Sequence, residues 1–377
     1  MKRISILLLI LLAWFVSAAW PQAEPQCKHK IITFDAPGAG TGAGQGTFPQ
    51  GIVAGDAVAG YYVDANNLNH GFLRTADGTI TTFDAPGAGT SAGQGTTVYG
   101  MNSSNAIVGI YWDTNNVGHG FLRHPRGTFT TVDAPGAGTG PGQLTTAGDI
   151  NQAGTIAGDY VDANNNGHGY LRAPDGTFTE FDVPDTAIGW PVFIGTFYAL
   201  NPKGTFVGLY IDSSYLFHGW LRTRDGAITE FDSPGAGTGA FQGTFADSIN
   251  PEGAIAGWYV DASNVNHGFL RTAEGTITTF DAPGAGTSAG QGTLAACVNP
   301  AGVIGGGYTD TNNVGHGFLR HPRGTFTTIN APGAGTGAGQ GTGASCSNAA
   351  GSIAGNYIDA NNVSHGFLRR ADEEHER

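Results

Sequence analysis

The strongest constraint on the fold is a repeat of about 49 residues. The pentapeptide His-Gly-aromatic-Leu-Arg occurs seven times, and six residues before each histidine stands an aspartate. An apolar residue followed by Asp, as in Phe83-Asp84, also recurs before each Pro-Gly-rich loop, with Asn330 taking the place of Asp in the last copy. Periods of 20–50 residues indicate solenoids, propellers or arrays. The seven recurrent pairs are Asp64/His70, Asp113/His119, Asp162/His168, Asp212/His218, Asp261/His267, Asp310/His316 and Asp359/His365.

Each repeat predicts four short β-strands. In residues 96–133, apolar or Thr-rich runs at 96–102, 106–112, 119–123 and 128–132 are separated by turn sequences rich in Asn, Ser, Pro and Gly. Four antiparallel strands in about 49 residues are typical of one propeller blade. The class is therefore all-β.

The two ends of the repeat region complement each other. The region begins with a lone fourth strand at 31–35 and ends after a third strand at Arg369-Arg370. We therefore expect residues 31–370 to form a seven-bladed β-propeller that the N-terminal strand closes by completing the last blade. A β-solenoid or a split propeller is the alternative.

The first residues are typical of an export signal. Lys2 and Arg3 precede an apolar run at 4–16 and then Ser17-Ala18-Ala19. We expect a signal peptide at 1–19, a tail at 20–30, a polar C-terminal tail at 371–377, and a secreted, periplasmic or cell-surface protein. A signal anchor is the alternative at the N-terminus, and no later segment is predicted to span a membrane.

The charge balance excludes one class of partner. Lys and Arg total 17 against 30 Asp and Glu, which gives a net charge of −13 at pH 7. A protein that binds nucleic acid needs a basic surface to neutralise phosphates. We therefore expect no nucleic-acid partner. We also expect the protein to be monomeric.

One repeat also resembles a known family. Residues 149–160, followed by His168-Gly169-Tyr170-Leu171-Arg172, resemble the HAF-type extracellular repeat. The resemblance covers residues 31–370 and implies an exported, propeller-like array. It brings no catalytic residues, because no function is established for that family.

The recurrent Asp and His residues have two interpretations, which are acid–base catalysis and a structural role within each repeat. A catalytic site needs one constellation rather than seven, so we interpret each Asp as capping its own turn and meeting the His across the hairpin. Asp162, Asn164 and Asn166 also match the first half of a calcium loop. Ala173 stands where that loop needs Glu, which favours a polar turn over Ca²⁺, and no other cofactor is predicted.

Two of the three cysteines occupy equivalent positions. Cys297 and Cys346 each lie 19 residues before a recurrent histidine, in a column of mostly small residues that fits an inner strand. Equivalent inner positions of adjacent blades suit the ~5.5–6 Å Cα separation of a disulfide. We expect a bond between Cys297 and Cys346, with Cys27 left over in the tail.

The fourth repeat departs most from the others and is the candidate for binding. Turns between the second and third strands share one end of a propeller with the longer crossovers between blades, and we call this end the elaborated face. The fourth repeat carries aromatic residues in these loops, and the next crossover adds one more. The candidate binding residues are Trp190, Phe193, Tyr215, Phe217 and Phe241.

These features predict an exported binding or interaction module, with a carbohydrate, cell-surface polymer or protein as partner at the elaborated face. A secreted lyase or hydrolase acting at the channel mouth is one alternative. A structural surface or matrix protein is another. No unique nucleophile or acid pair stands out from the repeats, which argues against an enzyme.

Overall fold

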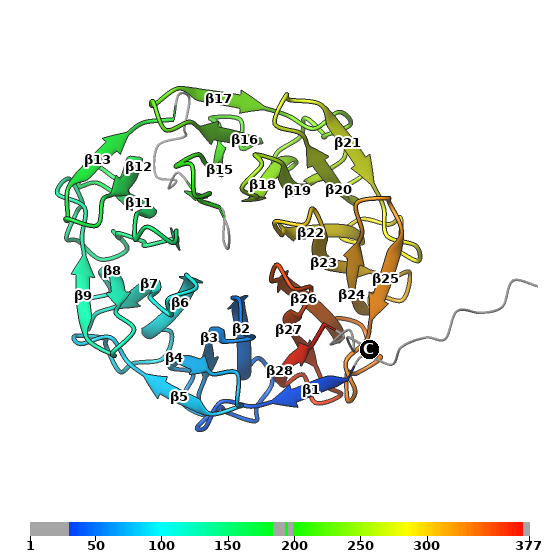
Figure 1. The fold of residues 1–377 in the computed structure, drawn as a ribbon, viewed down its shortest axis with the longest axis horizontal. Coiled ribbons are helices and arrows are strands. Elements are labelled where there is room, and N and C mark those ends of the chain that lie inside the picture. Colours follow the sequence, from blue (N-terminus) through cyan, green and yellow to red (C-terminus); the bar gives the residue numbers. More distant parts are fainter. Residues whose placement is uncertain (1–29, 184–192, 195–198, 372–377) are drawn as a thin grey trace, which may run out of the picture.

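The computed structural model describes residues 30–183, 193–194 and 199–371, and its regular elements are 28 β-strands. The strands pair antiparallel in groups of four, which stand around a common axis (Figure 1). The predicted all-β class is confirmed. Within the described ranges, no helix long and apolar enough to cross a bilayer is present.

Each group of four strands is here called a blade, and the strand order within a blade follows the chain. Blade 1 consists of β2 (Gly46–Ile52), β3 (Val58–Val63), β4 (Asn69–Arg74) and β5 (Ile80–Phe83). Blade 2 consists of β6 (Gly95–Met101), β7 (Ile107–Trp112), β8 (Gly118–Arg123) and β9 (Phe129–Val132). Blade 3 consists of β10 (Asp149–Ile150), β11 (Ile156–Val161), β12 (Gly167–Arg172) and β13 (Phe178–Phe181). Blades 4 and 5 consist of β14 (Phe193–Ile194), β15 (Phe206–Ile211), β16 (Phe217–Arg222) and β17 (Ile228–Phe231); and β18 (Gly243–Ile249), β19 (Ile255–Val260), β20 (Asn266–Arg271) and β21 (Ile277–Phe280). Blades 6 and 7 consist of β22 (Gly292–Val298), β23 (Ile304–Thr309), β24 (Gly315–Arg320) and β25 (Phe326–Ile329); and β26 (Gly341–Ser347), β27 (Ile353–Ile358) and β28 (Ser364–Arg369) with β1 (Ile31–Phe34).

Strand β1 pairs antiparallel with β28, which lies at the other end of the chain. The two strands lie side by side in Figure 1, and in their register Ile31 lies opposite Arg369 and Phe34 lies opposite Gly366. Strand β2 also meets β28 in a parallel bridge at Gly46, as β6 meets β4 at Gly95. The junction between blades 7 and 1 therefore has the same pairings as a junction between blades that are consecutive in the chain.

The recurrent pentapeptide is a packing motif. Its aromatic residue is 0–1% exposed in every blade, and a Cβ on the preceding Gly71 would lie 2.2 Å from the ring of Phe83. Glycine is therefore required where the ring that ends the fourth strand crosses the third strand. The seven buried aromatic residues are Phe72, Phe121, Tyr170, Trp220, Phe269, Phe318 and Phe367.

The apolar core is divided among the junctions between blades. Phe121 of blade 2 packs with Val53 and Leu73 of blade 1. Across the remaining junction, Phe72 of blade 1 clusters with Leu368 of blade 7. Each blade thus buries its faces against its two neighbours, because a single four-stranded sheet has no partner for its apolar faces.

The arginine of the pentapeptide also joins neighbouring blades. The guanidinium of Arg123 lies 4.7 Å from the ring centroid of Phe83 in the preceding blade, and that of Arg74 lies 5.1 Å from Phe34. Desolvation by burial lowers the pKa of both arginines. These cations contact aromatic faces between blades, where they contribute packing and cation–π attraction.

A set of asparagines follows the inner strands and links the blades at the end opposite the elaborated face. We call it the asparagine belt, and it comprises Asn102, Asn151, Asn201, Asn250, Asn299 and Asn348. Asn102 Nδ2 donates to Asn151 O (3.1 Å), and Asn348 Nδ2 donates to Val53 O (3.1 Å) between blades 7 and 1. The Oδ1 of Asn102 accepts from the backbone N–H groups of its own turn. One side chain thus satisfies both a turn and a junction.

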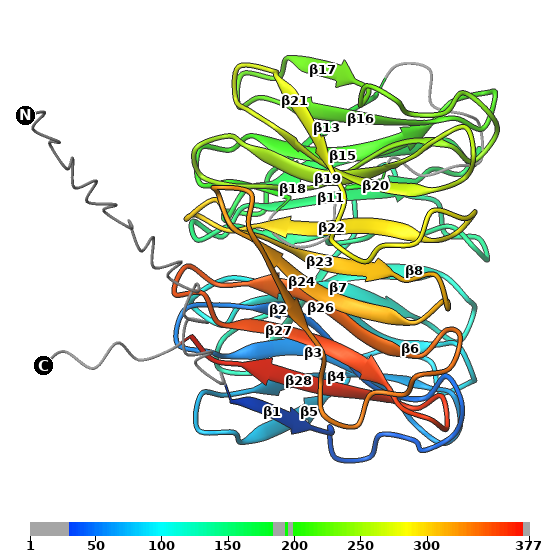
Figure 2. The same ribbon diagram turned by 90° about the vertical axis from the view of Figure 1, so that its right-hand side faces the viewer.

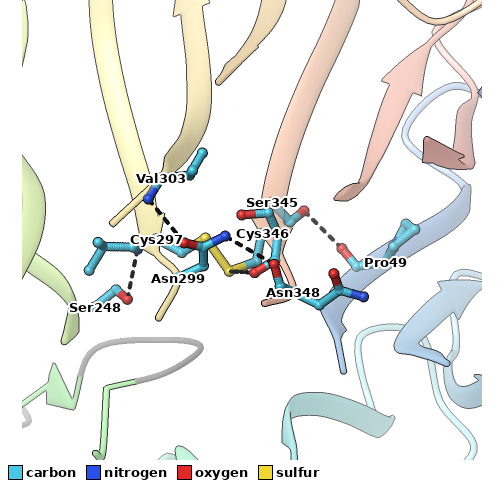
Figure 3. Close-up of a disulfide and its surroundings, with 10 residues drawn as sticks. Pro49, Ser248, Cys297, Asn299, Val303, Ser345, Cys346 and Asn348 are labelled. Atoms are coloured by element: carbon cyan, nitrogen blue, oxygen red, sulfur yellow. Dashed lines mark hydrogen bonds between the residues drawn. A yellow bond between two sulfur atoms is a disulfide. The ribbon is translucent and has the colours of Figure 1, made fainter. Parts of the chain in front are cut away.

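A disulfide joins Cys297 of β22 to Cys346 of β26, with the Cα atoms 5.5 Å apart (Figure 3). Both cysteines are fully buried. Beside the bond, Asn299 Nδ2 donates to Asn348 O at 2.9 Å, so two kinds of link tie blade 6 to blade 7 (Figure 3).

Replacing both cysteines by serine should lower the stability of the protein. A bond that closes a loop of 49 residues contributes about 4 kcal/mol by the chain-entropy model, as an upper value. Serine already stands at the equivalent position, Ser248, in blade 5, so the side chain itself fits this column. Chemical denaturation of the C297S/C346S variant measures the loss, and an unchanged midpoint would contradict the stabilising role.

Candidate functional site

The turns between second and third strands lie at the elaborated face, on the right in Figure 2. In blade 1, Asp64 Oδ1 accepts hydrogen bonds from the backbone N–H groups of Asn66 (2.8 Å) and Leu68 (2.9 Å). Asn67 has a left-handed backbone, with φ of 61°, which Asn tolerates better than other residues that have a side chain. The aspartate thus caps its own turn, and the same bonds recur in the other blades.

Each recurrent histidine lies between two side chains. His70 Nδ1 lies 2.9 Å from Asp84 Oδ1, and its Nε2 lies 3.7 Å from Asp64 Oδ2. The imidazole stacks on Tyr62 with the ring centroids 4.8 Å apart. Between blades 7 and 1, His365 Nδ1 lies 2.9 Å from Asp35 Oδ1 in the same arrangement.

The predicted contact between each turn Asp and its His is present, but the turn Asp is the more distant of two partners. His119 Nδ1 lies 3.0 Å from Asp133 Oδ2, whereas its Nε2 lies 3.8 Å from Asp113 Oδ2. The other blades show the same order of distances. The nearer partners, which bond Nδ1 at the end of the fourth strand, are Asp84 for His70, Asp133 for His119, Asp182 for His168, Asp232 for His218, Asp281 for His267, Asn330 for His316 and Asp35 for His365.

A comparison of blades 5 and 6 shows that the position of the histidine ring does not depend on the charge of its nearer partner. His267 Nδ1 lies 2.9 Å from Asp281 Oδ1, and its Nε2 lies 3.5 Å from Asp261 Oδ2. In blade 6, His316 Nδ1 lies 2.8 Å from Oδ1 of the neutral Asn330, and its Nε2 lies 3.5 Å from Asp310 Oδ2. Because an amide oxygen replaces the carboxylate without moving the ring, the contact serves the structure of each blade.

The nearer partner could have been found from spacing. Each of the first six recurrent His residues is followed 14 residues later by the polar residue of the apolar-Asp marker, as in His70 and Asp84, whereas the partner of His365 is Asp35. In blade 4, hydrogen bonding to Asp232, followed by its charge, raises the pKa of His218 against the effect of burial.

The residues of the calcium hypothesis form one of these turns. Asp162 Oδ1 accepts from the backbone N–H groups of Asn164 and Asn166, and Asn166 Nδ2 donates to Oδ2 (3.2 Å). The hydrogen bonds from Asn166 are the main cause that lowers the pKa of Asp162 to about 2. Among the described residues, no cluster of three or more His, Cys, Asp or Glu is arranged to hold a metal ion. The calcium site stays a prediction.

A glutamine at the end of each crossover holds the crossover to the next turn, except in blade 4. In blade 1, Gln45 Nε2 donates to Asn67 Oδ1 at 3.0 Å. The six pairs are Gln45/Asn67, Gln94/Asn116, Gln143/Asn165, Gln242/Asn264, Gln291/Asn313 and Gln340/Asn362. In blade 4, Phe193 and Tyr215 occupy these two positions in the sequence.

Tyr215 and Phe241 are the exposed large apolar side chains of the described residues, at 47% and 56% exposure. Their ring centroids are 5.6 Å apart, and Phe241 N donates to Tyr215 O at 2.6 Å. Of the other aromatic candidates, Trp190 lies outside the described residues, and only the backbone of Phe193 is described, in β14.

Both exposed aromatics have a left-handed backbone, with φ of 62° for Tyr215 and 63° for Phe241. The other blades place Asn at the position of Tyr215, and those aligned with Phe241 place Gly, as at Gly93 and Gly290. A bulky residue in this region costs about 1–2 kcal/mol. Retained strain of this kind is a reason to test the position for function.

A second group of aromatic rings lies on the neighbouring strands β16, β18 and β19. The rings of Phe217 and Phe245 have centroids 4.4 Å apart, and Phe245 stacks on Trp258 at 3.9 Å and an interplanar angle of 5°. The indole of Trp258 also donates a hydrogen bond to Asp247. We call Tyr215, Phe241, Phe217, Phe245 and Trp258 the aromatic strip.

Sequence analysis identified three members of the strip and missed Phe245 and Trp258. These two residues form a cross-strand pair of the first and second strands, and this pair differs in every blade in which it is described. The pairs are Phe48/Tyr61, Thr97/Ile110, Thr146/Asp159, Phe245/Trp258, Leu294/Gly307 and Gly343/Asn356. Variation within an otherwise regular repeat is the signal that could have singled out these positions as candidates for function.

Three carboxyl groups near the inner strands are strongly desolvated. Burial raises the pKa of Asp159 to about 7, although Thr146 Oγ1 donates a hydrogen bond to it. Burial also raises the pKa of Asp247 to about 7 and that of Asp149 to about 6. Asp149 is held by backbone N–H groups, including that of Leu200 at 3.0 Å. Such groups near neutrality are candidates for proton transfer.

A cavity of about 200 Å³ lies at the asparagine belt, at the end opposite the aromatic pair. Apolar side chains of several inner strands line it, including Met101, Ile150, Leu200 and Ile249, together with Asp149. Sequence analysis placed function at the elaborated face and did not anticipate this second opening.

The buried carboxyl groups should make stability depend on pH. An unfolded Asp has a pKa of about 3.9, so between pH 4 and 7 the folded protein binds more protons than the unfolded chain, and stability falls as pH rises through this window. The melting temperature should therefore fall less between pH 4 and pH 8 in D159N and D247N than in the wild type. The exposed Glu252→Gln variant is the control, and equal slopes in all four proteins would contradict the desolvation.

The comparisons with known proteins bear on the fold. No family model and no curated protein matches the sequence. A catalytically inactive virginiamycin B lyase from Staphylococcus aureus with quinupristin matches with a TM-score of 0.54 at 15% identity, covering 91% of this chain and 99% of that one. A lectin from Burkholderia pseudomallei matches with a TM-score of 0.56 at 9% identity, covering 86% of this chain and 96% of that one. At these identities the likeness shows the fold alone, and the chain has an all-β, antiparallel, propeller-like architecture.

Proposed function

We propose that the protein is an exported, seven-bladed β-propeller of the HAF-type extracellular repeat class that acts as a binding module. Its ring is closed by β1, and the pairing of Ile31 with Arg369 supports this closure. The contact of His365 with Asp35 repeats across this junction the arrangement of the other blades. The apolar run at 4–16 supports export, and the disulfide fits an oxidising compartment.

Closure predicts that β1 is needed for stability. Deletion of residues 20–35 from the mature chain removes Phe34 and Asp35 and leaves β28 with an unpaired edge. We expect a lower melting temperature and aggregation, which calorimetry and size-exclusion chromatography measure. Deletion of residues 20–29 alone is the matched control, and equal behaviour of the two deletions would exclude closure by β1.

We propose a carbohydrate or cell-surface polymer as the ligand, bound at the aromatic strip. The observation that carries this proposal is the pair Tyr215 and Phe241, which is exposed and held in a strained backbone where the other repeats have Asn and Gly. Exposed aromatic faces stack on the apolar face of a sugar ring, and Phe217 packs on Phe245 on the neighbouring strands. The strained backbone is thus retained at two positions whose rings are about half exposed to solvent.

Restoring the residues of the other repeats should separate binding from stability. Tyr215→Asn and Phe241→Gly relieve the left-handed strain, so each should raise the free energy of unfolding by about 1 kcal/mol. Both should abolish binding on a glycan array of the mature protein. Loss of stability instead would indicate that the two rings pack on the rim, and an unchanged array profile would exclude the strip as the binding site.

An enzymatic alternative has one observation in its favour. Asp159 and Asp247 have pKa values raised to about 7 by burial, in the range that suits general acid–base catalysis. Turnover on a panel of polysaccharides that is lost in D159N or D247N, but kept in Y215N/F241G, would assign the protein as a lyase or hydrolase. A protein that neither binds nor turns over any glycan would instead fit a structural matrix component.

A further inference from the structure

An opening on the elaborated face lies between blades 6 and 7, at the end opposite the cavity of the asparagine belt. It is a cleft of about 460 Å³, within the ~300–1,000 Å³ range of small-molecule sites. Its walls come from β22, β23 and β24 of blade 6 and from β26 and β27 of blade 7, which lie side by side (Figure 1). Leu294, Gly307 and Gly315 lie on one side, and Gly343, Asn356 and Ile358 on the other.

The equivalent space between blades 4 and 5 is filled by large rings. Phe217, Phe245 and Trp258 stand at the positions that Gly315, Gly343 and Asn356 take in the cleft, and they stack on one another. Between blades 1 and 2, polar side chains meet at these positions, with Asn69 Nδ2 donating to Thr97 Oγ1 at 3.1 Å. The cleft is therefore open because of the side chains that blades 6 and 7 lack.

The fold does not require glycine at the three positions that open the cleft. A Cβ would lie 3.5 Å from the nearest atom at Gly307, 3.4 Å at Gly315 and 3.7 Å at Gly343, which are ordinary contacts. None of the three has a left-handed backbone. By contrast, a Cβ on the neighbouring Gly306 would lie 2.2 Å from Leu294 O. Gly307, Gly315 and Gly343 thus create space rather than permit a turn.

The chemistry of the walls indicates a neutral ligand. Among the described residues that line the cleft, none carries a formal charge. Amide groups stand at Asn313, whose Oδ1 accepts from Gln291 Nε2, and at Asn356, whose Nδ2 donates to Ser364 Oγ and whose Oδ1 faces Gly343. Leu294 and Ile358 offer apolar surface. An ion would lose its hydration here without gaining a counter-charge, whereas a polyhydroxylated ring presents both hydroxyl groups and C–H faces.

We infer that the cleft between blades 6 and 7 binds one neutral sugar residue, at a site separate from the aromatic strip. The inference shares with the proposed function only the class of ligand. The two sites lie at different junctions of the ring, between blades 4 and 5 and between blades 6 and 7.

Filling the cleft tests the inference. Gly343→Phe introduces the residue that blade 5 has at Phe245, and Gly307→Leu introduces the residue that blade 4 has at Leu209. Gly305→Ala is the matched control, because its Cβ has the same room (3.6 Å) but lies beside Cys297, away from the cleft. Melting temperatures check the folding of each variant, and the two filling variants keep the test valid if one of them does not fold.

The probes are neutral hexoses and N-acetylhexosamines, tested singly by saturation-transfer difference NMR, with glucuronate as a charged counterpart. We expect a neutral sugar to bind the wild type, the G305A variant and the Y215N/F241G variant. In the Y215N/F241G background, which removes binding at the aromatic strip, G343F and G307L should weaken sugar binding at least tenfold. No binding to the wild type, unchanged binding to the filled variants, or tighter binding of glucuronate would overturn the inference.

The arms of this experiment separate the two proposals. Loss of the sugar signal in Y215N/F241G with full binding by G343F would overturn the cleft and leave the aromatic strip standing. A negative glycan array together with sugar binding that G343F abolishes would overturn the aromatic strip and leave the cleft standing.

Discussion

The structure depends on the packing of each blade against its two neighbours. A four-stranded sheet has apolar faces with no partner of its own, so the fully buried aromatic of the pentapeptide fills the space between blades. In five of the seven copies the glycine before it admits the aromatic ring that ends the fourth strand, and in most copies the arginine after it lies over an aromatic of the preceding blade. One short motif therefore sets the distance and angle between blades at each junction.

Because the framework repeats, the positions at which the repeat is broken are the candidates for function. The framework consists of the His–Asp contacts, the asparagine belt and the buried aromatic residues, and it leaves one cross-strand pair per blade free to vary. Phe245/Trp258 extends an exposed aromatic surface, whereas Gly343/Asn356 helps to open a cleft. Asp159 belongs to the same set of positions, where a carboxyl group is held at a pKa of about 7 by burial.

Much of the fold could be predicted from spacing alone. Strands, turns and the pairing of the two chain ends follow from residues that recur at one interval, and the equivalent positions of Cys297 and Cys346 indicated the column in which they bond. The nearer partner of each histidine was missed, because the Asp at the end of the fourth strand is 14 residues away and belongs to a different sequence marker. Phe245 and Trp258 were missed because a residue on an inner strand is normally assigned to the core.

The sequence by itself determined the number of repeats, the strands within each, and the positions at which the fourth repeat departs from the rest, since all of these are properties of order along the chain. Only the tertiary structure decided that Tyr215 and Phe241 touch, that Phe217 packs on Phe245, and that three glycines of two blades border one cleft. The physical reason is that these contacts form between blades. They depend on how neighbouring sheets bring together residues from different repeats, which no local pattern specifies.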